Sequence, residues 1–213
     1  MVFSRYYNER KELVEVSMDE IEILTQDEIN KDKIAKHIYE RLYTRFLKIF
    51  EYSDSRNSQY QKNGISVERK IFNEEFKNGF LQLAASSLLI ETFAAFLTGN
   101  NKTPRGKAPK QFNKVFEYAE SKNNKLKVFK SNNYFYEKIR CGILHQGETK
   151  GKYLITRKNK KLLDGNEIDA HLFHQELKSL LNSYKKDLEN SDWNNEIWIN
   201  CRDKIKHIIN NSK

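Results

Sequence analysis

The sequence is poor in cysteine, proline and glycine: its 213 residues include 2 Cys, 2 Pro and 8 Gly. Cysteines at positions 141 and 201 cannot build a disulfide framework or a four-cysteine zinc site, so we expect a reducing, cytoplasmic location. So few prolines and glycines argue against a loop-rich or all-β chain. The first residues lack the apolar core of a signal peptide, and we expect no secretory export.

Long apolar runs are also scarce, and only the run at 80–97 approaches the length of a membrane span. Gln82, Ser86, Ser87 and Glu91 interrupt it, which favours a buried central helix and predicts no membrane partner. The chain has no Gly-rich phosphate loop and no Gly-x-Ser-x-Gly motif. Their absence argues against an ordinary nucleotide-hydrolysing domain or a serine hydrolase.

Aromatic and basic residues are abundant instead. The 13 Phe, 11 Tyr and 2 Trp supply enough apolar area for a core without disulfides. The 38 Lys and Arg exceed the 29 Asp and Glu, which gives a net charge of +9 and favours an anionic partner such as RNA. Charge by itself does not identify that partner.

The apolar spacing predicts helices. After an N-terminal arm (1–24), Thr25 and Glu28 fit a capping box that begins the first long helix. A polar loop at 52–64 then leads to a second long helix of about 66–97. The buried faces of these two helices are predicted to be Ile34, Ile38, Leu42, Phe46 and Phe50 in the first, and Phe72, Phe76, Phe80, Leu83 and Leu88 in the second.

The remainder of the chain continues this pattern after a break at 99–110, which holds both prolines. Further helices are expected at about 110–122, from 132, at 169–189 and at 194–210, and KYLITR with KLLDG predicts a two-stranded hairpin at 152–164. The fold class is therefore all-α, one domain over 1–213: a helical bundle with a small β-hairpin inserted before the C-terminal helices. The inner face of the last helix is predicted to be Trp193, Ile197, Cys201, Ile205 and Ile208.

Two histidines resemble metal ligands in spacing only. His171 and His174 lie three residues apart with Glu176 nearby, but no third and fourth ligands share the spacing. We interpret them as surface or half-buried helix histidines, and expect no metal site and no cofactor.

The hexapeptide RCGILH, from Arg140 to His145, is the strongest candidate for catalysis. Metal-free RNA cleavage needs a base for the 2′-hydroxyl, an acid for the leaving 5′-oxygen and a cation beside the phosphate. Histidine titrates near neutrality, and arginine matches two phosphate oxygens. The same spacing recurs at Arg202 and His207, but in an ordinary amphipathic helix whose polar face we expect in solvent. The first copy instead ends an aromatic helix and precedes the polar turn QGETKG, where ligand groups can enter.

Helix geometry predicts that one chain does not complete the site. Five residues correspond to about 140° of rotation, so Arg140 and His145 are expected on different faces. Each chain also supplies a single motif histidine, whereas two chains around a twofold axis would bring together two histidines and two arginines. We therefore expect a homodimer.

The segment IRCGILHQGETKG, in a helical chain with a preceding long apolar helix, resembles the HEPN superfamily of α-helical bundles with an Arg-x(4–6)-His motif. The resemblance extends over roughly 25–210, but only the motif region is specific. It implies a metal-independent endoribonuclease of toxin–antitoxin, phage-defence or RNA-processing type, a homodimer whose two motifs meet in one cleft. It also implies catalytic roles for Arg140 and His145, and an antitoxin or defence-system protein as a partner.

Three positions bear on this resemblance. Active members often carry a polar residue where this chain has Cys141, and Asp203 in the second copy fits that detail better. Members silenced by adenylylation carry a tyrosine where this chain has Gly147. Glu91 resembles the polar residue that many members place opposite the motif, and as a buried acid it would pair with Arg140; the alternative is that it faces solvent.

Other residues are assigned supporting roles, and two further hypotheses stay open. Gln146 and Glu148 are possible supporting groups, and a run of basic residues could follow the RNA backbone: Lys150, Lys152, Arg157, Lys158, Lys160 and Lys161. Tyr134, Tyr136 and Tyr153 either stack on unpaired bases or pack in the core. The alternatives to a nuclease are a non-catalytic HEPN-like module that binds RNA, a nucleotide or a protein, and a plain helical scaffold.

Overall fold

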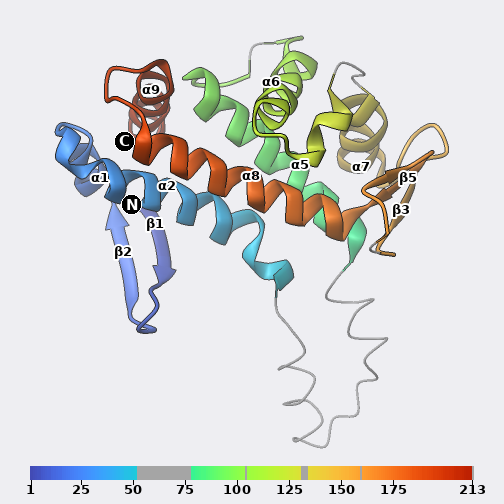
Figure 1. The fold of residues 1–213 in the computed structure, drawn as a ribbon, viewed down its shortest axis with the longest axis horizontal. Coiled ribbons are helices and arrows are strands. Elements are labelled where there is room, and N and C mark those ends of the chain that lie inside the picture. Colours follow the sequence, from blue (N-terminus) through green and yellow to red (C-terminus); the bar gives the residue numbers. More distant parts are fainter. Residues whose placement is uncertain (52–77, 104, 131–133, 159, 213) are drawn as a thin grey trace, which may run out of the picture.

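The computed structural model describes residues 1–51, 78–103, 105–130, 134–158 and 160–212 (Figure 1). They form a predominantly helical bundle, as predicted. Helices α2 (Lys31–Phe46) and α8 (Ala170–Asn190) run side by side, and α5 (Gly79–Thr98) packs against both. Helices α6 (Ala108–Ser121) and α9 (Glu196–Asn210) pack on α5. The shorter turns are α1 (Met18–Leu24), α7 (Cys141–Gln146), the 3₁₀ turns η1 (Glu28–Asn30), η2 (Lys48–Glu51) and η3 (Lys125–Phe129), and the π-helix η4 (Phe135–Arg140).

The N-terminal segment is a β-hairpin followed by a helix, where the sequence predicted an arm. Strands β1 (Val2–Tyr7) and β2 (Leu13–Ser17) pair antiparallel, and β1 packs on α2. The capping box predicted at Thr25 and Glu28 is wrong: Ser17 and Glu20 form it at the start of α1, and Thr25 ends that helix. A Ser-x-x-Glu sequence precedes the Thr-x-x-Glu sequence, and the first of the two begins the helix.

The predicted hairpin at 152–164 has its strands in the expected places but pairs differently. Strands β3 (Leu154–Thr156) and β4 (Leu163–Asp164) do not pair with each other. Both pair with a third strand, β5 (Glu167–Asp169), which lies between them, parallel to β3 and antiparallel to β4. The tight turn is therefore at Gly165, whose φ of 57° suits glycine. Ile168, buried at the centre of β5, explains why this strand and not β4 takes the middle position.

The core is rich in aromatic rings. Phe112, Phe116, Phe129, Phe135 and Phe173 contact one another with ring centroids 4.8–6.5 Å apart, joining α6, η3, η4 and α8. These rings hold η4, which carries the candidate motif, against the bundle.

Several predicted core positions differ from those observed. Ile34, Ile38 and Leu42 are buried as predicted, but Phe46 and Phe50 are only partly buried.

In α5, Leu83 is buried, Phe80 is partly buried and Leu88 is exposed, while Phe72 and Phe76 lie outside the described residues. In α9 the buried face is Trp198, Cys201, Ile205 and Ile209. Cys201 and Ile205 are therefore buried as predicted, whereas Trp193, Ile197 and Ile208 are only partly buried.

Candidate functional site

The candidate catalytic residues Arg140 and His145 lie where a π-helical turn joins an α-helical one. Helices η4 and α7 are continuous, and within η4 the amide of Cys141 donates to the carbonyl of Tyr136, five residues earlier. Such π turns are rare in proteins and are frequent at functional sites. Phe135 and Ile139 are buried on the core side of the turn, so Arg140 lies beside α5.

Arg140 is fixed by an ion pair with Glu91 of α5. Its Nε and Nη2 atoms lie 2.7 and 2.6 Å from Glu91 Oε1, and the two side chains are only 17% and 25% exposed. Of the two alternatives for Glu91, pairing with Arg140 is therefore the one observed. Burial alone would lower the pKa of Arg140, but the charge and hydrogen bond of Glu91 raise it above its usual value. The guanidinium is a fixed cation.

His145 completes the pair. Its Nε2 atom lies 3.2 Å from Nη1 of Arg140, and the imidazole is exposed. Because an arginine can only donate, Nε2 accepts this hydrogen bond, and a neutral His145 carries its proton on Nδ1. The rotation of about 140° predicted the two side chains on different faces of the helix, but in the structure they are in contact. The rotation describes where the side chains start, and the long arginine side chain covers the remaining angle.

Two neighbours complete the surroundings of Arg140. The guanidinium lies 5.4 Å from the ring centre of Tyr136, within the range of a cation–π contact. Burial raises the pKa of Tyr136, as does its hydrogen bond with Cys141, which also bonds to Arg140. The partly buried Cys141 thiol thus interacts with both of these side chains.

The turn after the motif folds back onto the helix. Gly147 ends α7 with a φ of 72°, a conformation that a tyrosine would adopt only with strain. The amide of Lys150 donates to the carbonyl of Lys138 at 2.8 Å. This close return requires Gly142, since a Cβ there would lie 2.4 Å from the carbonyl oxygen of Glu148. The returning chain therefore packs against Gly142 and Lys138, while His145 is exposed.

The predicted supporting residues are less closely associated with Arg140 and His145. Gln146 and Glu148 are exposed, and among the described residues no hydrogen bond joins their side chains to Arg140 or His145. Lys150 and Lys152 lie in the turn that follows His145, and their position lets a ligand reach them.

The remaining predicted RNA-binding residues lie in the segment that joins β3 to β4. Lys158 pairs with Glu167 at 2.6 Å and Lys161 pairs with Asp164 at 3.2 Å. Together with Lys160 they surround a depression of about 300 Å³ whose wall includes neither Arg140 nor His145. Arg157 is partly buried, and burial lowers its pKa. Their positive charge is thus partly neutralised and not gathered at the motif.

Two of the three tyrosines proposed to stack on bases already pack against each other. Tyr134 and Tyr153 stack on each other at 5.5 Å with an interplanar angle of 7°, and burial raises the pKa of Tyr134. Tyr136 is the one of the three that contacts the motif.

The second copy of the motif has a structural arginine. Arg202 donates from Nη1 to the carbonyl of Trp193 at 2.7 Å and lies 4.2 Å from its ring centre. This arginine joins the middle of α9 to the turn that precedes the helix. No hydrogen bond between Arg202 and His207 occurs among the described residues, in contrast to Arg140 and His145.

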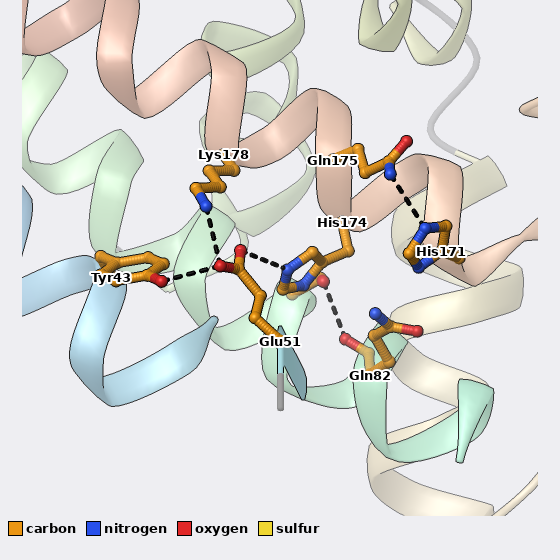
Figure 2. A network of polar contacts seen from close by, with 8 residues as sticks. Tyr43, Glu51, Gln82, His171, His174, Gln175 and Lys178 are labelled. Carbon is orange, nitrogen blue, oxygen red and sulfur yellow. Dashed lines mark hydrogen bonds and ion pairs between the residues drawn. The ribbon is translucent and has the colours of Figure 1, made fainter. Parts of the chain in front are cut away.

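A second polar cluster, not predicted from the sequence, centres on Glu51 (Figure 2). Its carboxylate accepts hydrogen bonds from Tyr43 and Lys178 and contacts His174, while His171 contacts Gln175. Glu51 carried no motif signal, because two of these three partners, His174 and Lys178, lie more than 100 residues away in the sequence. Across the described ranges, no group of three or more His, Cys, Asp or Glu is placed to hold a metal ion. His174 is buried, unlike the half-buried or surface position predicted.

Helix α5 is the one described helix long and apolar enough to cross a membrane, and more than half of it is buried in the bundle. Comparison of the chain with protein-family models, with curated proteins and with solved structures finds no match.

Proposed function

We propose that this chain is a metal-independent endoribonuclease of HEPN type whose site is built on Arg140 and His145. The observation that carries the proposal is the contact of 3.2 Å between a fixed guanidinium and an exposed imidazole. A cation held beside an unprotonated histidine nitrogen is the arrangement that phosphodiester cleavage by a neighbouring hydroxyl requires.

In this mechanism Arg140 binds the scissile phosphate and stabilises the charge that accumulates on its oxygens. His145 Nε2 takes the proton of the RNA 2′-hydroxyl as the bond between the 2′-oxygen and phosphorus forms. The bond between phosphorus and the 5′-oxygen breaks, and that oxygen leaves with a proton from His145 of the partner subunit. The products are a 2′,3′-cyclic phosphate and a 5′-hydroxyl. Glu91 positions Arg140 and does not touch the reacting atoms.

An apolar surface beside the motif supports the homodimer. Leu81 and Leu88 are 56% and 43% exposed on the outer face of α5, and Leu144 of α7 is 37% exposed. Leu81 and Leu88 are two helical turns apart, and the same face continues to Glu91. An apolar face of this kind next to an exposed, half-complete site suits a second copy of the chain, which would bring the second histidine.

The biological setting is proposed from the same resemblance: a toxin, phage-defence or RNA-processing enzyme controlled by an antitoxin or another protein of its system. The basic residues after the motif would contact RNA phosphates, with Lys150 and Lys152 nearest in sequence to His145.

Cys141 favours a second candidate function. A thiol in place of a more strongly polar group after the motif arginine suits a non-catalytic HEPN-like module that binds RNA, a nucleotide or a protein. In that case Arg140 would hold a ligand without promoting a reaction.

The test is cleavage of mixed cellular RNA by purified protein in excess chelator. His145→Ala is compared with His207→Ala, a matched change in the second copy of the motif. We expect cleavage to survive chelation and to fall by about 10²–10⁴-fold only with His145→Ala. Loss with His207→Ala alone would move the site to α9. RNA binding without cleavage by the wild-type protein would favour the non-catalytic module.

A further inference from the structure

A cavity of about 510 Å³ lies between η2 and α8 and shares no lining residue with the Arg140–His145 site (Figure 2). Its wall on α8 is a polar stripe in which His174, Lys178 and Asn182 follow one another at intervals of four residues, on one helical face. Phe50 and Glu51 of η2 form the facing wall. The volume falls within the range of small-molecule sites.

The polar wall is held in one arrangement by Glu51. One carboxylate oxygen accepts from the Tyr43 hydroxyl and from Lys178 Nζ, both at 2.7 Å, and the other lies 3.1 Å from His174 Nε2. Burial alone would raise the pKa of Glu51, but hydrogen bonds from Lys178, Tyr43 and His174 lower it below its usual value. The carboxylate is therefore charged and oriented before any ligand arrives.

The buried position of His174 destabilises the folded state in a way that packing alone does not require. Its side chain is 3% exposed, and burial lowers the pKa of the imidazole, which is therefore neutral near pH 7. With Nε2 donating to Glu51, Nδ1 is an acceptor, and it is buried without a hydrogen-bond partner among the described residues. An unsatisfied buried acceptor destabilises the folded state, so its presence beside a cavity points to a functional constraint.

The wall has hydrogen-bonding capacity but no net charge. The negative Glu51 is offset by the positive Lys178, whose ammonium has further N–H groups to donate. Asn182 offers a donor and an acceptor, and the Phe50 ring, which meets His174 edge-on at 6.1 Å, adds an aromatic surface. A free phosphate would be repelled by the negative charge of Glu51. A neutral planar heterocycle with donors and acceptors on its edge instead matches the absence of net charge, the hydrogen-bonding groups and the aromatic surface.

We propose that this cavity binds a nucleobase, either of a free nucleoside or nucleotide or as an unpaired base of RNA. Bases of both sources have a π face for Phe50 and a polar edge for Glu51, Lys178 and Asn182. The site does not depend on the proposed cleavage, because it uses neither Arg140 nor His145.

The test is calorimetric titration of the full chain with adenosine, guanosine, cytidine, uridine and a short single-stranded RNA. Phe50→Leu and Asn182→Ala change the cavity, and Glu117→Gln on exposed α6 is the matched control. We expect saturable binding of at least one nucleoside or of the RNA, weakened about tenfold or more by Phe50→Leu, weakened by Asn182→Ala and unchanged in Glu117→Gln. Circular dichroism checks that each variant is folded, and Asn182, which is only partly buried, keeps the test valid if Phe50→Leu is unstable.

The titrants also separate the two sources of the base. Nucleoside binding identifies a free ligand, and binding of RNA alone identifies an unpaired base. Absence of binding, or binding that neither cavity variant weakens, would overturn the proposal. His145→Ala should bind the free nucleosides with wild-type affinity, so failure of the cleavage mechanism and failure of this site are distinguishable.

Discussion

Removing Glu91 should both destabilise the bundle and misplace the arginine of the site. Glu91→Ala leaves Arg140 charged, 17% exposed and without its carboxylate partner. Glu91→Gln keeps an oxygen that can accept from Nε and Nη2 but removes the negative charge. The two variants therefore separate the loss of charge from the loss of the hydrogen-bonding group.

The expected loss in the free energy of unfolding follows from the burial of the Glu91–Arg140 ion pair. Removing one partner of a fully buried ion pair costs about 3–5 kcal/mol, and a hydrogen bond to a charged group contributes about 1.5–3 kcal/mol. Because both side chains retain some exposure, we expect Glu91→Ala to lower the free energy of unfolding by about 2–3 kcal/mol, and Glu91→Gln by about 1–2 kcal/mol. For a chain of this size, 1 kcal/mol corresponds to about 2–4 °C in Tm.

The assays are urea unfolding and RNA cleavage under single-turnover conditions. Cleavage should fall about 10²-fold in Glu91→Ala, since a displaced cation no longer meets the phosphate, and less in Glu91→Gln. A double-mutant cycle with Arg140→Ala should give a coupling energy of about 1–3 kcal/mol. Unchanged stability in Glu91→Ala would refute the ion pair, and reduced stability with unchanged cleavage would refute the positioning role.

Three further predictions test other parts of the structure. Gly142→Ala should lower the free energy of unfolding by about 1–3 kcal/mol in urea titrations, because the new Cβ meets the carbonyl oxygen of Glu148; an unchanged midpoint would contradict the close return of the chain. Burial lowers the pKa of both His37 and His174, so the unfolded chain binds protons at higher pH than the folded chain. The free energy of unfolding should therefore be greatest above about pH 6.5 and fall as pH drops toward the lowered values, and a double Gln variant should flatten this slope. Leu88→Lys should convert a dimer to a monomer in analytical ultracentrifugation, whereas an unaltered dimer would place the interface elsewhere.

The helices could be predicted from the sequence where apolar spacing was regular. The helix expected at 169–189 is α8, and six of its regularly spaced apolar residues are buried: Phe173, Leu177, Leu180, Leu181, Tyr184 and Leu188. Periodicity failed at Leu88, because α5 is apolar on nearly every side and its spacing does not distinguish the buried face from the exposed one. The strand order β3-β5-β4 was missed since the two apolar runs gave no indication that a third strand, around Ile168, would separate them.

The candidate site was predictable only in part. Arg140 and His145 are separated by a fixed number of residues, and a motif of that kind is visible in sequence. Their contact depends on the reach of the arginine side chain and on Glu91, which holds Arg140 from 49 residues earlier in the sequence, and neither is visible in the motif itself. The Glu51 cluster was missed because its members come from α2, η2 and α8, and only the packing of α2 on α8 brings them together.

The chemistry of the cut tests the catalytic role of Arg140 and His145 most directly. Purified protein in excess chelator is mixed with an RNA and, separately, with its fully 2′-deoxy counterpart, and the product ends are identified by mass spectrometry. If His145 takes a proton from the 2′-hydroxyl, the RNA is cut to a 2′,3′-cyclic phosphate, the deoxy strand stays intact, and His145→Ala cuts neither. Cleavage of the deoxy strand, or cyclic phosphate formed equally by His145→Ala, would contradict the assignment of the Arg140–His145 pair as the catalytic site.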